Sequence, residues 1–221
     1  MSKVGVCLSG CGFLDGSEIQ EAVFTLLALD QAGASAICCA PEMPQAQVVN
    51  HATQDRVGEQ RDVLIEAARI ARGNIVPLAR MDAHSIDAVI FPGGYGAAQN
   101  LSTFAVDGPE CTVNYEVETL VADMMEMKKP IGVICIAPAM LARLVGKRNI
   151  EAKLTIGNDT GTAEAINKMG ATHCDCPVTE MVVDEENRIV STPAYMYEAS
   201  PAQVFEGVKK CVDEMLRLVK A

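Results

Sequence analysis

The sequence contains no tryptophan, and phenylalanine and tyrosine are so few that aromatic residues make up only 4% of its 221 residues. Because 49% of the residues are nevertheless hydrophobic, the core must be built from aliphatic side chains and methionine. Positive charge is also scarce: 18 Lys and Arg stand against 29 Asp and Glu, which gives a formal net charge of −11. We therefore expect neither a nucleic-acid partner nor attachment to an acidic membrane surface.

Long apolar runs and regular cysteine spacing are absent as well. No stretch approaches the roughly 20 apolar residues that cross a bilayer, and the apolar run after Lys3 is too short for a signal-peptide core. The nine cysteines are odd in number and lack the spacing of a disulfide framework. We expect reduced thiols in a cytoplasmic protein of the bacterial cytosol, or in an organelle matrix if a targeting segment was removed. The length suits one α/β domain over residues 1–221.

Apolar runs that indicate strands alternate with segments that indicate helices. The predicted strands are 4–8, 34–40, 87–91, 131–134 and 153–156, with a hairpin over 181–191. The predicted helices are 18–32, 61–72, 112–127, 162–169 and 201–219, and residues 41–59 are predicted to form an irregular surface segment. This alternation is typical of a mostly parallel sheet covered by helices on both faces.

The segment KKPIGVICIAPAMLARLV, residues 128–145, organises the rest of the chain. Only Cys135 and Ile136 separate the strand at 131–134 from a helix that begins at Ala137. So tight a turn forces its middle residue into a strained conformation and lifts the side chain clear of the sheet, which indicates a nucleophile elbow carrying cysteine. We expect the following helix N-terminus to depress the thiol pKa below its free value of about 8.5. An ordinary buried cysteine is the alternative.

Two glycine-rich loops follow other predicted strands, at residues 9–17 and 92–100. Ligands of parallel sheets bind beyond the carboxyl ends of the strands, so these loops should meet the elbow. The adjacent Gly93 and Gly94 permit close approach of the backbone, whose N–H groups would face a developing oxyanion; a simple tight turn is the alternative. The first loop does not satisfy G-x-G-x-x-G, because Asp15 occupies the third glycine position, and we expect no nucleotide cofactor.

Glu18 and Glu21 lie in the first turn of the first predicted helix. Acidic residues there interact favourably with the helix dipole, which is explanation enough for both. The alternative is that one carboxyl shares a proton with Cys135. Ser17 and Gln20 match a capping box, and with Ser17 as N-cap, Glu21 is the covered carboxyl and Glu18 the fraying one. Burial would then raise the pKa of Glu21 and make it the proton-handling partner of the thiol.

Other candidate groups receive simpler interpretations. We predict that Cys11, in the first glycine loop, lies near the same pocket as a resolving thiol for Cys135 under oxidation. His173, Cys174 and Cys176 are too close in sequence to bind one tetrahedral zinc together, so we expect no metal site. His51 is interpreted as a loop histidine and not as a catalytic base.

Four motifs in combination resemble a known family: GCG-x3-GSEIxEA, FPGGYGAAQNLS, CIAPAM and STPAYM. Together they resemble the ElbB-type subgroup of the PfpI superfamily, which is similar in fold to class I glutamine amidotransferases. The resemblance runs from Lys3 to about Leu216. It implies a flavodoxin-like, doubly wound sheet in a single class I glutamine amidotransferase-like domain, and a homodimer.

The resemblance also implies roles for particular residues. Cys135 matches the elbow cysteine and Glu21 its carboxylate partner. Gly94 and the N–H of Ile136 match the oxyanion-hole positions, beside Gly93. Two departures count against protease and glutaminase activity: Ile136 stands where PfpI-like proteases have histidine, and His173 is not followed by the glutamate of the amidotransferase His-x-Glu pair.

The function implied by the resemblance is a weak glyoxalase. Such an enzyme converts small 2-oxoaldehydes, glyoxal and methylglyoxal, to hydroxyacids through the cysteine and without a cofactor. Two alternatives stay open from the sequence. One is a redox-responsive or regulatory protein with an oxidisable elbow cysteine, and the other is an amidotransferase-like module that lacks the catalytic histidine.

Overall fold

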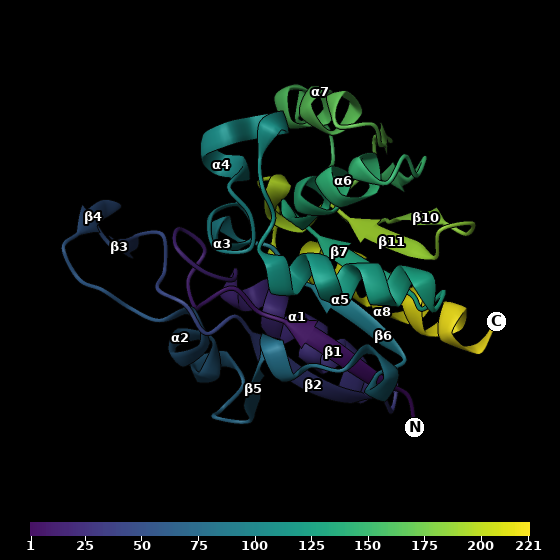
Figure 1. Cartoon of the computed structure of the whole chain (residues 1–221), viewed down its shortest axis with the longest axis horizontal. Coiled ribbons are helices and arrows are strands. Elements are labelled where there is room, and N and C mark those ends of the chain that lie inside the picture. The colour runs from purple at the N-terminus through teal and green to yellow at the C-terminus, as the bar shows by residue number, and fades with distance from the viewer.

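A seven-stranded sheet runs through the centre of the molecule in the computed structural model, which describes all 221 residues (Figure 1). In spatial order its strands are β10 (Val182–Asp184), β11 (Ile189–Thr192), β7 (Ile131–Ile134), β6 (Ala88–Phe91), β1 (Lys3–Cys7), β2 (Ser35–Ala40) and β5 (Ile75–Pro77). All neighbours are parallel except β10, which is antiparallel to β11. The order β2-β1-β6-β7-β11 is the 2-1-3-4-5 order of flavodoxin-like folds, so the predicted fold class is confirmed.

Helices cover both faces of this sheet. One face packs against α3 (Tyr95–Gln99), α5 (Tyr115–Glu126) and α6 (Ala137–Lys147), and α7 (Thr160–Lys168) packs against α6 on the same side. The other face packs against α1 (Ile19–Gln31), α2 (Val63–Ile70) and α8 (Pro201–Lys220). Phe91 is the only aromatic residue among the largest fully buried side chains, and the others are Leu, Ile and Met. The predicted aliphatic, methionine-containing core is therefore confirmed.

Several short elements lie outside the sheet, and some differ from the predicted ones. Residues 41–59 are not wholly irregular, because they contain the antiparallel hairpin β3 (Val48–Asn50) and β4 (Asp55–Val57). The strand predicted at 153–156 is the two-residue β8 (Lys153–Leu154), which pairs with β9 (Thr172–His173). Helix α4 (Phe104–Asp107) and four 3₁₀ turns, at 78–80, 83–85, 108–110 and 194–196, complete the fold. No helix is both long and apolar enough to cross a membrane.

The N-cap of helix α1 lies one residue later than predicted, at Glu18 and not at Ser17. Ser17 is fully buried, and its hydroxyl accepts a hydrogen bond from the backbone N–H of Ser9 at 2.8 Å. Glu18 is the N-cap instead, and its carboxylate accepts from the N–H of Glu21 at 2.6 Å. Ser17 is not the cap because the glycine-rich loop has already engaged its hydroxyl. Glu21 consequently occupies the third position of the helix, not the fourth, on the side that faces the elbow.

Candidate active site

Cys135 occupies a sharp turn between β7 and α6, as the sequence predicts. Its φ is 61°, a left-handed conformation that is rare for a residue with a side chain. The N–H of Cys135 donates to the carbonyl of Thr192 at 2.9 Å, which fixes the turn to the neighbouring strand β11. The backbone N–H groups of Gly94 and Ile136 point at the sulfur. The elbow geometry is thus present, and two N–H groups converge on the site of a reacting atom.

Glu21 is fully buried directly beside this thiol. One carboxyl oxygen accepts from the N–H of Gly93 at 2.9 Å, the other accepts from the N–H of Tyr195 at 3.2 Å, and the carboxyl also contacts the thiol of Cys135. Burial, reinforced by the nearby charge of Glu18, raises the pKa of Glu21 to about 8. The raised pKa predicted for this carboxyl is confirmed, and at neutral pH most molecules carry a proton on Glu21.

The thiol of Cys135 does not have the depressed pKa that the helix N-terminus led us to expect. Burial raises its pKa well above the ordinary value of 9.0, and the neighbouring Glu21 carboxylate raises it further. The N–H groups of Gly94 and Ile136 act in the opposite direction. With 7% of Cys135 exposed, the loss of hydration outweighs these two dipoles. The resting pair is therefore a neutral thiol beside a mostly neutral carboxyl.

The two glycines after β6 are required by the space around this pair. A Cβ atom on Gly93 would lie 2.3 Å from the Cβ of Cys135 and 2.7 Å from a carboxyl oxygen of Glu21. Gly94 has a φ of 94°, and a Cβ there would lie 2.3 Å from the backbone nitrogen of Glu18. Both positions exclude any side chain, so this loop is more than a tight turn: it brings its backbone into contact with the reactive pair.

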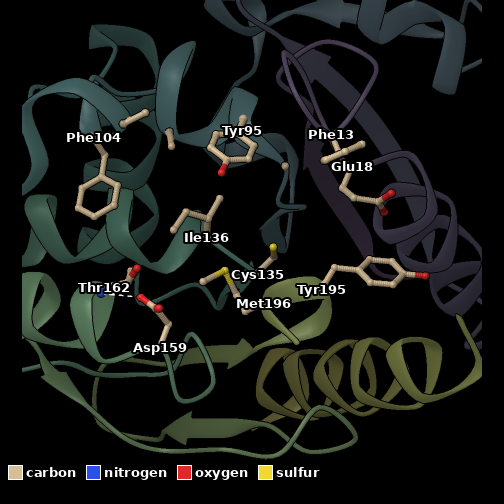
Figure 2. A pocket seen from close by; sticks show the side chains of 13 residues that line it. Phe13, Glu18, Tyr95, Phe104, Cys135, Ile136, Asp159, Thr162, Tyr195 and Met196 are labelled. Atoms are coloured by element: carbon tan, nitrogen blue, oxygen red, sulfur yellow. Dashed lines mark hydrogen bonds between the residues drawn. The ribbon is translucent and has the colours of Figure 1, made fainter. Parts of the chain in front are cut away.

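A pocket of about 460 Å³ opens over the thiol (Figure 2). Figure 2 shows Cys135 between two walls, one containing Phe104 and Asp159 and the other containing Phe13 and Glu18. Its thirteen lining residues are mostly apolar: Phe13, Glu18, Gly94, Tyr95, Ala98, Phe104, Ala105, Cys135, Ile136, Asp159, Thr162, Tyr195 and Met196. The cavity is large enough for a small organic molecule, and the sulfur of Cys135 lies in its lining.

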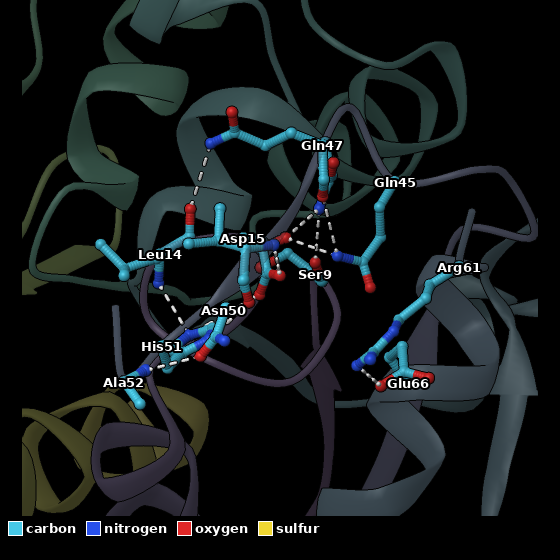
Figure 3. A network of polar contacts seen from close by, with 12 residues as sticks. Ser9, Leu14, Asp15, Gln45, Gln47, Asn50, His51, Ala52, Arg61 and Glu66 are labelled. Atoms are coloured by element: carbon cyan, nitrogen blue, oxygen red, sulfur yellow. Dashed lines mark hydrogen bonds and ion pairs between the residues drawn. The ribbon is translucent and has the colours of Figure 1, made fainter. Parts of the chain in front are cut away.

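The loop that carries Phe13 is held by a polar network from the segment 41–59 (Figure 3). Asp15 is 4% exposed, and its carboxylate accepts from the N–H of Val49 at 2.8 Å. His51 accepts from the N–H of Leu14 at 3.3 Å and lies 3.7 Å from the Asp15 carboxylate. The Asn100 amide donates to the carbonyl of Asp15 at 2.9 Å. This network was not predicted from the sequence. Asp15, which stands at the third glycine position of G-x-G-x-x-G, was the residue that could have indicated it.

Cys11 is not among the residues that line the pocket, so the structure gives no support to the prediction that it lies near Cys135. The charged groups that act on the pKa of Cys11 are Glu66, Arg69 and Asp15, and none of them lines the pocket. Two of these charged groups, Glu66 and Arg69, belong to α2, and the flanking glycines Gly10 and Gly12 have φ values of 113° and 127°.

The histidines lie outside the pocket. The ring of His173 accepts from the N–H of Ile156 at 3.3 Å, and burial lowers its pKa, so it is a neutral structural side chain. His51 belongs to the loop network, which agrees with its interpretation as a loop histidine, and His84 sits in a 3₁₀ turn. No three His, Cys, Asp or Glu side chains lie together as a metal ion would require.

Known proteins with similar sequences identify the family to which the chain belongs. The human glutamine amidotransferase-like class 1 domain-containing protein 3, mitochondrial, is 45% identical to the chain, and the match covers 98% of the chain and 83% of the human protein. The chain belongs to this glutamine amidotransferase-like family. Family relatives also include the rat ES1 protein homolog, mitochondrial, at 44% identity over 98% of the chain and 84% of that protein. No family model matches the chain.

Solved structures agree with this membership. An isoprenoid biosynthesis protein with amidotransferase-like domain from Ehrlichia chaffeensis is 38% identical and superposes with a TM-score of 0.93 over 99% of both chains. Drosophila melanogaster DJ-1beta is 16% identical, with a TM-score of 0.56 over 100% of this chain and 97% of its own. At that identity the second comparison shows only a shared fold. The chain is therefore a flavodoxin-like member of the glutamine amidotransferase-like family, and it shares its fold with DJ-1beta.

Proposed function

We propose that the protein is a cofactor-independent, glyoxalase-like enzyme that converts small 2-oxoaldehydes, glyoxal and methylglyoxal, to 2-hydroxyacids. One observation carries the proposal: the thiol of Cys135 contacts the fully buried carboxyl of Glu21, and the backbone N–H groups of Gly94 and Ile136 lie next to the sulfur. A thiol, a carboxyl that both holds and releases a proton near neutral pH, and oxyanion donors are what this chemistry needs. The similarity to the Ehrlichia isoprenoid biosynthesis protein supports placing the chain in the ElbB-type subgroup.

The first step joins the thiol to the aldehyde. The sulfur of Cys135 forms a bond with the aldehyde carbon while the carbonyl electron pair moves to oxygen, which the N–H groups of Gly94 and Ile136 stabilise. The neutral carboxyl of Glu21 gives its proton to that oxygen and takes the thiol proton in exchange. The product is a hemithioacetal, and Glu21 ends the step protonated as it began.

The second step moves one hydrogen between adjacent carbons. Once Glu21 has released its proton to solvent, its carboxylate removes the proton from the former aldehyde carbon, and the electrons form an enediolate whose negative charge lies on the neighbouring carbonyl oxygen. Glu21 then returns the proton to that second carbon, the hydroxyl proton of the first carbon passes to the neighbouring oxygen, and a 2-hydroxyacyl thioester remains on Cys135. Water cleaves the thioester to free thiol and 2-hydroxyacid, so the reaction consumes one water and no oxidant. A pKa of about 8 keeps both forms of Glu21 populated near neutral pH.

The pocket gives no support to a histidine-dependent reaction. None of its lining residues is histidine, so there is no group to act on Cys135 as the base does in a cysteine–histidine pair. This argues against glutaminase and protease activity. A redox-responsive cysteine that turns over nothing is the remaining alternative, and the experiment below distinguishes it.

The test measures lactate formed from methylglyoxal by purified protein. We expect turnover by the wild type, its loss in Cys135→Ala, and a decrease of about 100-fold or more in Glu21→Gln. Cys174→Ala is the matched thiol control, and His51→Ala, His84→Ala and His173→Ala should retain activity within a few-fold, since none lines the pocket.

Three results would contradict the proposal. One is no lactate from folded wild-type protein, another is activity that survives in Cys135→Ala, and the third is glutamine hydrolysis that depends on Cys135. Absence of lactate together with stoichiometric oxidation of Cys135 by peroxide would favour the redox-responsive alternative.

The location of the protein in the cell and its assembly into a homodimer are also proposals. The human and rat relatives are named mitochondrial, which supports the organelle-matrix alternative for this chain over the bacterial cytosol. The homodimer implied by the resemblance stays a prediction, which sedimentation equilibrium of the purified protein tests.

A further inference from the structure

Aromatic side chains gather at the pocket in a protein that has very few of them. The whole chain contains five Phe, four Tyr and no Trp. Four of these nine residues line the pocket: Phe13, Tyr95, Phe104 and Tyr195. Phe13 is 44% exposed and Tyr95 50%, so their rings face the open space and are not packed in the core. The core itself is aliphatic, which makes this concentration a property of the site.

The charges on the pocket walls are all negative. Glu18 and Asp159 are the only carboxylic side chains among the thirteen lining residues, and none of the thirteen is Lys, Arg or His. Burial raises the pKa of Glu18. Asp159 caps α7 by accepting from the N–H of Thr162 at 2.8 Å, and that bond lowers its pKa, so it is ionised at neutral pH. The helix end that would attract an anion is already occupied by the protein's own carboxylate.

An aromatic and an acidic side chain lie on the same wall of the pocket. Figure 2 shows Phe104 and Asp159 on one side of Cys135, with Thr162 between them. Aromatic faces and carboxylates both attract cations, and aromatic-lined sites are the usual way in which proteins hold alkylammonium groups. An anionic ligand would meet the Asp159 carboxylate and no cation to balance its charge.

We propose that the pocket selects 2-oxoaldehydes that carry a cationic group, an alkylammonium above all, over neutral and anionic ones. This substrate class rests on the proposed glyoxalase-like function. The aldehyde carbon reaches the sulfur of Cys135, its oxygen faces the N–H groups of Gly94 and Ile136, and the cation lies against Phe104 and Asp159. Methylglyoxal is far smaller than the 460 Å³ cavity and leaves this wall unoccupied.

Three arylglyoxals of matched size test the selection. They carry a para trimethylammoniomethyl group, its neutral isostere neopentyl, or an anionic carboxymethyl group; the methylene separates the charge from the reacting carbonyls. At low ionic strength we expect the wild-type kcat/KM for the cation to exceed that for the neopentyl compound about tenfold, from one cation–π contact and one exposed charge pair. The anion should be the poorest substrate, and added salt should reduce the preference.

Two variants locate the effect. Asp159→Asn keeps the helix cap, because asparagine accepts the same N–H bond, and should reduce the cation preference about threefold. Phe104→Leu should reduce it by a similar factor. Asp62→Asn is the matched control: Asp62 caps α2 by accepting from the N–H of Ile65 at 3.1 Å, lies outside the pocket, and should leave the preference unchanged.

A binding measurement separates this inference from the proposed function. Cys135→Ala, which cannot form the covalent adduct, should bind benzyltrimethylammonium at least about tenfold more tightly than phenylacetate in isothermal titration calorimetry. If it does, while the wild type turns over no glyoxal, the cation site stands and the glyoxalase function falls. If methylglyoxal is turned over but the three arylglyoxals react alike and Cys135→Ala binds both probes equally, the function stands and the cation selection is wrong.

Discussion

Glu21 should make the protein lose stability as the pH rises from about 4.5 to about 8. In the folded protein this carboxyl keeps its proton up to a pKa of about 8, whereas in the unfolded chain it releases the proton near the usual 4.5. Between these values the folded state binds more protons than the unfolded state. The free energy of unfolding therefore falls with pH across this window, and the contribution is fully present only below it.

The expected magnitude is large for a single side chain. Each pH unit in the window removes about 1.4 kcal/mol, so about 5 kcal/mol is lost between pH 4.5 and 8. Glu21→Gln does not titrate, but its NH2 group must face the N–H of either Gly93 or Tyr195, where the carboxyl has an acceptor. That mismatch costs about 1–3 kcal/mol at every pH. The wild type should be the more stable protein at pH 5 and the variant the more stable one at pH 9.

Urea denaturation followed by circular dichroism, under reducing conditions and at pH 5 to 9, measures this crossing. Glu164→Gln, which changes an exposed carboxyl on α7, is the matched control and should run parallel to the wild type. Carbon-13 NMR of the Glu21 carboxyl, assigned by its absence in Glu21→Gln, should show a midpoint near pH 8. Stability curves of wild type and Glu21→Gln that stay parallel over this range would refute the reasoning.

Three further predictions follow from the same geometry. Gly93→Ala should lower turnover of methylglyoxal about 100-fold, because the new methyl group would lie 2.3 Å from the Cβ of Cys135; Gly58→Ala, which meets nothing within 4 Å, should leave turnover unchanged. Limiting iodoacetamide at pH 7 should label the half-buried Cys174 before Cys135, as mapped by mass spectrometry, and first labelling at Cys135 would contradict its raised pKa. Asp15→Ala should destabilise the protein by about 1–3 kcal/mol through the lost acceptor for Val49 and speed tryptic cleavage near β4; an unchanged cleavage rate would show that the network does not hold the segment.

The elbow could be predicted from the sequence because it is a local feature. Only two residues separate the apolar run at 131–134 from a helix-forming segment, and so short a connection predicts a sharp turn at Cys135. The positive φ of Cys135 confirms that turn. The cap of α1 could not be read in the same way. Ser17 is a good capping residue by local rules, but a contact with Ser9 from the preceding loop engages its hydroxyl, and only the folded structure reveals that contact.

The effect of burial on the pKa of Cys135 could not be predicted from the sequence. The helix dipole at Cys135 is visible in the sequence, but the dehydration that reverses its effect on the thiol pKa depends on every segment packed around it. The concentration of aromatic residues around the pocket could not be predicted for a similar reason. Phe13, Phe104 and Tyr195 come from three distant segments, and strand order alone brings their loops to one edge of the sheet.

The bonds made by Glu21 have a consequence for the protein during its synthesis. Its two backbone partners, Gly93 and Tyr195, are 72 and 174 residues further along the chain. Contacts this distant in sequence form late in folding, and the second one is impossible until the ribosome has made residue 195. Until then the Glu21 carboxyl lacks one of its two backbone donors, so the nascent chain does not hold the complete native surroundings of Cys135. The segment after the last strand supplies that donor.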